Sequence, residues 1–146
     1  MKRLSLWLLA AGMMLLAGCA MHRTPEQFAH SFFEDGKESI IKALKKQDAS
    51  PAQLDQARAI LDRNEPTVTA DLAVFFRSQQ DVILGVTSGK DTEQLLALEG
   101  KMHEANDTAL RGIGKMHEEL HAAVGDKIWT GATAQMEQKM AHYLKR

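Results

Sequence analysis

Cysteine, proline and aromatic residues are scarce in this chain of 146 residues. The single cysteine, Cys19, cannot form a disulfide within the chain, so stability must come from packing, a metal ion or oligomerisation. Eighteen basic side chains stand against nineteen acidic ones, a balance that excludes the strongly basic surface of a nucleic-acid-binding protein. Nucleophile–base pairs, phosphate loops and cofactor motifs are also missing from the sequence. We therefore expect a protein that is not an enzyme.

Long apolar runs are absent too, with one exception at the N-terminus. Two basic residues precede a largely apolar run over residues 4–16, which is too short to span a bilayer comfortably. The small residues of Leu16-Ala17-Gly18-Cys19 then complete the layout of a secretory signal peptide. This motif resembles the lipobox of bacterial lipoproteins, in which the cysteine is lipidated and becomes the new N-terminus.

The lipobox resemblance implies that residues 1–18 are a signal peptide, that Cys19 carries the lipid, and that residues 19–24 form a short lipidated tether. Because Ala20 rather than an acidic residue follows the cysteine, it also implies attachment to the outer membrane, facing the periplasm. An uncleaved N-terminal anchor is the alternative. Removal of the signal peptide leaves 16 basic and 19 acidic side chains, a net charge of −3. The remaining length suits a single domain over residues 25–146.

Helix signals dominate the rest of the chain. Thr24-Pro25-Glu26-Gln27 combines an N-cap residue, a proline at the first helical position and a glutamine three residues after the cap, and it predicts a helix to about Lys46. The segment 50–53 repeats this logic and predicts a second helix, kinked at Pro66 and ending in a turn over residues 85–89. A strand over residues 82–86 is allowed by propensity but lacks a partner.

Residues 91–124 predict a third helix, which we expect to be the longest, with Gly125 at its end. Thr130 or Thr133 is expected to cap a short last helix. The fold class is therefore all-α, an antiparallel helical hairpin or small four-helix arrangement. Because the second helix is expected to be shorter than the third, pairing of two chains into a homodimer is a further possibility.

The helix starts carry a family resemblance. Ala49-Ser50-Pro51-Ala52-Gln53 resembles the Leu-Thr-x-x-Gln motif of the Spy/CpxP family of periplasmic chaperones, which also includes periplasmic heavy-metal sensors. Residues 127–136 sit where the family has its second copy, with departures from the motif in both places. The resemblance implies a helical hairpin that dimerises into a cradle and holds unfolded or aggregating proteins without ATP. Lipidation departs from the soluble members of the family.

A histidine pair on the third helix suggests a metal site. His117-Glu118-Glu119-Leu120-His121 matches His-Glu-x-x-His, and residues four apart share one helix face. We reject a protease because the chain is small and has neither a visible sheet nor an obvious third ligand. A non-catalytic site for zinc or another divalent transition metal would need ligands from elsewhere. The candidate ligands are His117, His121, His142, His30 and Glu34.

The leading hypothesis is a lipid-anchored periplasmic protein that binds unfolded or envelope proteins in a stress-response role. Flexible apolar side chains among charges suit weak binding of many sequences. The candidate contacts are Phe75, Phe76, Met102 and Met116, and one of the two adjacent phenylalanines is expected to be partly exposed. A metal sensor or buffer and a structural envelope lipoprotein are the alternatives.

Overall fold

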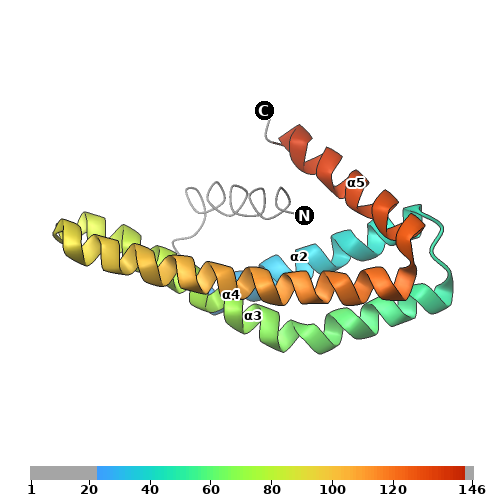
Figure 1. Cartoon of the computed structure of the whole chain (residues 1–146), viewed down its shortest axis with the longest axis horizontal. Coiled ribbons are helices and arrows are strands. Elements are labelled where there is room, and N and C mark those ends of the chain that lie inside the picture. Colours follow the sequence, from blue (N-terminus) through green and yellow to red (C-terminus); the bar gives the residue numbers. More distant parts are fainter. Residues whose placement is uncertain (1–22, 144–146) are drawn as a thin grey trace.

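The computed structural model describes the backbone of residues 23–143 and the side chains of residues 23–138. It contains four helices, α2 (Pro25–Lys46), α3 (Pro51–Thr87), α4 (Thr92–Val124) and α5 (Asp126–Tyr143), and no strand over this range (Figure 1). The predicted all-α fold is confirmed. No helix within the described range is long and apolar enough to cross a membrane. Cys19, the expected signal peptide and the side chain of His142 lie outside the described residues.

Helices α2 and α3 begin with the same capping arrangement. The Thr24 hydroxyl accepts a hydrogen bond from the Gln27 backbone, and the Gln27 side chain accepts one from the Thr24 backbone. Ser50 and Gln53 form the equivalent pair at the start of α3. Each pair satisfies two backbone N–H groups that a helix start leaves without partners. These local bonds explain why both predicted helix starts are correct to the residue.

Helix α3 continues through Pro66 and is the longest element, with 37 residues against 33 in α4. Proline removes a backbone donor, and α3 bends along its length in Figure 1. The helix nevertheless runs without interruption to Thr87, so residues 82–86, predicted as a possible strand, are helical. The expectation that α4 would be the longest helix is wrong. Its partner of matching length is α3 of the same chain, so helix length alone does not require a second chain.

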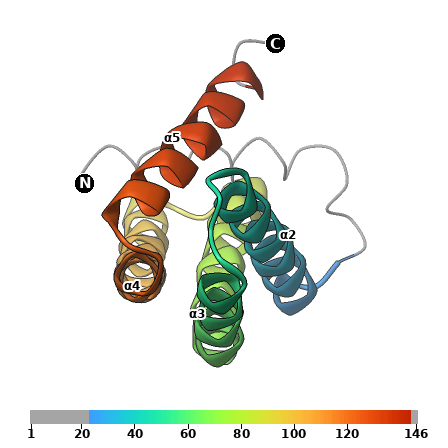
Figure 2. The same cartoon turned by 90° about the vertical axis from the view of Figure 1, so that its right-hand side faces the viewer.

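The three long helices lie side by side, with α3 between α2 and α4, as Figure 2 shows. Helix α5 packs against α2 and α4 at the end of the molecule where α4 finishes. Helix α2 is shorter than its neighbours, so the turn between α3 and α4 projects beyond it.

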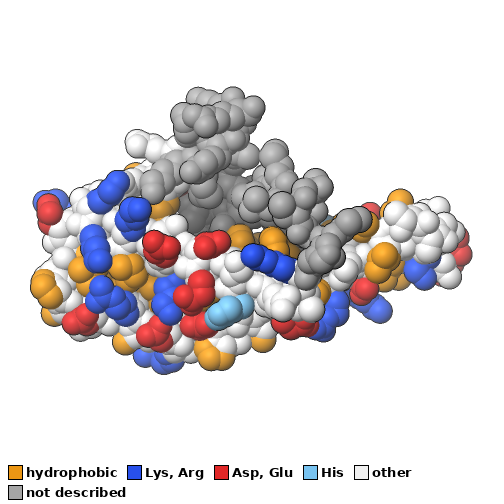
Figure 3. Space-filling model, turned by 180° about the vertical axis from the view of Figure 1, so that it is seen from behind, with side chains coloured by type: hydrophobic (Ala, Val, Ile, Leu, Met, Phe, Trp, Pro, Cys, Tyr) orange, Lys and Arg blue, Asp and Glu red, His pale blue; other side chains and the backbone are white. Residues whose placement is uncertain are grey.

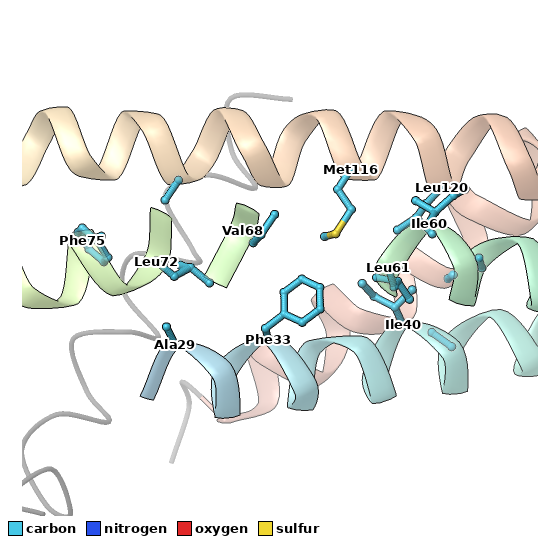
Figure 4. Close-up of a cluster of buried hydrophobic side chains, with 14 of the residues drawn as sticks. Ala29, Phe33, Ile40, Ile60, Leu61, Val68, Leu72, Phe75, Met116 and Leu120 are labelled. Atoms are coloured by element: carbon cyan, nitrogen blue, oxygen red, sulfur yellow. The ribbon is translucent and has the colours of Figure 1, made fainter. Parts of the chain in front are cut away.

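The hydrophobic core runs along α3. Side chains of α2 and α4 point toward one another across it, with Phe33 on α2 and Met116 on α4 as examples (Figure 4). Residues three and four positions apart align on one side of a helix, so each helix presents one apolar face to this core. The largest fully buried side chains are Leu44, Leu61, Val68, Leu120 and Val124.

The link between α4 and α5 is a single residue, Gly125, with φ 85° and ψ 158°. This backbone conformation is essentially restricted to glycine. Helix α5 therefore begins at once, at Asp126, and the expected caps Thr130 and Thr133 lie inside it. The Thr133 hydroxyl instead donates to the carbonyl of Trp129, at 3.0 Å. The predicted end of α4 is correct, and the predicted start of α5 is wrong.

Candidate functional site

Three of the four side chains predicted to contact clients belong to the core. Phe75, Phe76 and Met116 are only 7%, 6% and 4% exposed, so they cannot serve as a surface in this conformation. The expectation that one of the adjacent phenylalanines would be exposed is wrong because α3 is covered on two sides. The Phe76 ring meets Phe28 edge-on, with 4.6 Å between ring centroids.

Met102, the fourth candidate, is half buried. It belongs to a group of apolar side chains that pack against the core yet keep part of their surface exposed. We call four of these the core rim: Phe28 and Phe32 on α2, and Met102 and Ile113 on α4. A single row of three helices leaves such side chains at its edges because no second layer covers them.

In the described part of the chain, the most exposed large apolar side chains gather at the turn between α3 and α4. We call residues 81–98 the hairpin tip. Its exposed members are Leu96, 62% exposed, and Ile83, Leu84 and Val86, 54–61% exposed. Apolar side chains are visible at the narrow end of the molecule in Figure 3. This surface was not predicted from the sequence, although the apolar run 82–86 was a signal for it, because a hairpin of two helices cannot bury apolar residues on all sides.

Close packing shapes the hairpin tip. Gly85 is buried where a Cβ atom would lie only 2.8 Å from Leu98, so α3 and α4 approach closely there. Gly89 makes the turn with φ 74°. An open pocket of about 370 Å³ lies beside this contact, lined by Leu84, Gly85 and Leu98 among others. The tip is therefore a defined surface rather than a frayed helix end.

The two histidines of α4, His117 and His121, lie against an aromatic side chain of α5, Trp129. The rings of His117 and His121 lie 5.4 Å and 6.3 Å from the Trp129 ring, measured between centroids. Nε2 of His121 is 3.0 Å from Oδ1 of Asp126, the first residue of α5. Burial lowers the pKa of His117 below its ordinary value of 6.5. These contacts join α4 to α5 across Gly125, with the Trp129 ring packed against both histidines.

The predicted metal ligands whose side chains are described do not form a metal site with one another. Among the residues described, no group of three or more His, Cys, Asp or Glu side chains could hold a metal ion. His30 instead lies 3.3 Å from Glu65 of α3, and Glu34 lies 3.3 Å from Lys37. The side chain of His142 is outside the described range. His30 therefore contacts α3, whereas Glu34 pairs with a residue of its own helix, α2.

Ion pairs fix the position of α2 along α3. Lys37 Nζ lies 2.7 Å from Asp62 and 3.6 Å from Glu65, and the hydrogen bond to Asp62 is the main cause that raises the pKa of Lys37. At the other end of α2, Glu26 pairs with Arg77. These contacts place the N-terminus of α2 beside the last third of α3, close to the hairpin tip.

Comparison of the chain with protein-family models, with curated proteins and with solved structures gave no significant match.

Proposed function

We propose that this protein is a lipid-anchored component of the bacterial cell envelope that holds unfolded or envelope proteins by weak contacts and performs no chemistry. The sequence Leu16-Ala17-Gly18-Cys19 supports the anchor, with outer-membrane attachment facing the periplasm. The resemblance at residues 49–53 to Spy/CpxP chaperones supports the holding role.

The observation that carries the holding role is the core rim. Its four side chains are anchored in the core on one side and exposed on the other, so they offer apolar contacts without unfolding the domain. Charged groups neighbour them along the helices: Glu26, two residues before Phe28, pairs with Arg77, which follows Phe76, the residue that Phe28 contacts. Met102 adds a flexible thioether that adapts to different partners. Such a mixed surface suits weak binding of many sequences rather than one tight complex.

Suppression of aggregation tests the holding role. The chain should reduce light scattering by a chemically denatured client at near-stoichiometric amounts, and Met102→Gln with Ile113→Gln should weaken this effect severalfold. Val74→Gln with Leu96→Gln is the matched control, because it removes two apolar side chains that are exposed and lie outside the core rim. Melting curves should show both variants folded.

Two results would contradict the proposal. A folded native chain that suppresses no aggregation would exclude the holding role. If only the control variant lost the ability to suppress aggregation, clients would bind at a surface other than the core rim. The anchor is tested separately by the mass of the N-terminal peptide after isolation from membranes, which should begin at Cys19 and carry acyl chains.

A further inference from the structure

We propose that the hairpin tip is a second membrane contact, which the N-terminal anchor holds against the bilayer surface. This inference rests on the proposed attachment at residue 19, and it concerns a surface separate from the core rim. It assigns a partner, a lipid bilayer, to the most exposed apolar side chains of the described domain.

The distribution of exposed apolar side chains is one-sided. Five large apolar side chains within residues 23–138 are more than half exposed; four of them lie in the hairpin tip, and Val74 is the exception. The opposite end of the hairpin, where α3 begins and α4 ends, has none among its described residues. Exposed apolar groups at one end of an elongated domain are typical of a site that meets an apolar partner.

The position of α2 decides which end the anchor can reach. The Glu26–Arg77 pair and the contact of Phe28 with Phe76 hold the start of α2 beside Arg77. From there the tip at Thr87 is ten residues away along α3. That distance is roughly 15 Å at the rise of an α-helix.

The tether between Cys19 and Pro25 is long enough to reach the hairpin tip but not the opposite end of α3. Cys19 precedes Pro25 by six residues, which span at most about 20 Å when extended. The far end of α3, at Pro51, lies 26 residues from Arg77. That separation is roughly 39 Å, about twice the reach of the tether. A lipid on residue 19 therefore keeps the tip, and not the opposite end, next to the bilayer.

Charge at the tip selects the type of lipid surface. The hairpin tip, residues 81–98, contains three acidic side chains and one basic side chain, Lys90, for a net charge of −2. An anionic surface repels such a segment, whereas a zwitterionic one admits its aliphatic side chains without this penalty. Ile83 and Val86 lie one turn apart, so they can enter the interface together. We therefore expect shallow insertion into phosphatidylcholine or phosphatidylethanolamine.

Fluorescent probes at single cysteines test the contact. The full chain, purified from membranes, is reconstituted into phosphatidylcholine vesicles after substitution with Val86→Cys or Leu96→Cys at the tip. Arg58→Cys and Lys127→Cys are controls near the opposite end, and all four positions are exposed. If Cys19 is lipidated, its sulfur is blocked and the label reports one site. Nitroxide-bearing lipids report burial in the bilayer, and aqueous iodide reports exposure to water.

The tip probes should be quenched severalfold more strongly by nitroxide lipids than the control probes, and severalfold less by iodide. Partial replacement by phosphatidylglycerol at low salt should weaken the difference. Equal iodide quenching at all four positions would overturn the inference. Iodide protection that persists without vesicles and increases with protein concentration would also overturn it, in favour of a second copy at the tip.

The mass of the N-terminal peptide separates this result from the anchor itself. A lipidated N-terminus with exposed tip probes refutes the membrane contact and leaves the lipoprotein proposal intact. A free Cys19 thiol refutes lipidation. The probes are then measured in a Cys19→Ser background, where exposed tip probes refute the membrane contact as well and buried tip probes support it without the lipid.

Discussion

Gln53 joins two distant parts of the chain, and its removal offers a sharp test of the fold. Its side-chain oxygen accepts a hydrogen bond of 2.9 Å from the Ser50 backbone, within the capping box of α3. Its side-chain nitrogen donates a bond of 2.8 Å to the carbonyl of Val124, the last residue of α4. Gln27 has the same capping role at α2 but makes no such bond to another helix in the described structure.

The two glutamines therefore form a matched pair. Replacement of either by alanine removes the capping bond, which contributes about 0.5–1 kcal/mol. Gln53→Ala also leaves the carbonyl of Val124 without this partner, at an additional cost of about 1 kcal/mol. The Tm of Gln53→Ala should therefore be roughly 4 °C lower than the Tm of Gln27→Ala for a domain of this size.

Thermal unfolding followed by circular dichroism measures the difference. A third variant, Gln53→Glu, keeps the oxygen for the capping box and loses only the donor to Val124, so it should reproduce most of the extra loss. Equal Tm values for Gln27→Ala and Gln53→Ala would refute the role of the Val124 bond.

Three further predictions address the core, the α4–α5 link and the histidine cluster. Leu120→Ala empties a site that is 0% exposed and should reduce the free energy of unfolding by about 3 kcal/mol, as measured in urea. Gly125→Ala forces a side chain into a positive-φ conformation and should cost about 1–3 kcal/mol in the same assay; no loss would exclude this backbone geometry. Burial lowers the pKa of His117, so the unfolded chain binds its proton first and stability falls as the pH drops below about 6.5. His117→Gln should reduce that loss between pH 7 and pH 5 in paired urea titrations, and an unchanged pH dependence would show that His117 is not its source.

Local signals in the sequence predicted the starts of the helices well. Caps such as Thr24 and Ser50 act within one turn, so the sequence alone contains the information that they need. Gly125 was predictable as the end of α4 for the same reason.

Features that depend on neighbouring helices were harder to predict. Pro66 did not shorten α3 because α2 and α4 hold that region from both sides, and neither contact is visible in the local sequence. The same two-sided packing buries Phe75 together with Phe76. For the histidines, spacing on α4 correctly placed His117 and His121 on a shared face, but it could not show that Trp129 of α5 would meet both rings.

The order of contacts along α3 has a consequence for how the chain folds. Helices α2 and α4 are its immediate neighbours in sequence, so most of the core can form by closing short turns. Chains dominated by such local contacts fold rapidly. The packing of α5 on α2 is different, because it joins the two ends of the domain and needs the other helices in place first. We therefore expect α5 to dock last in folding and to be released first in unfolding.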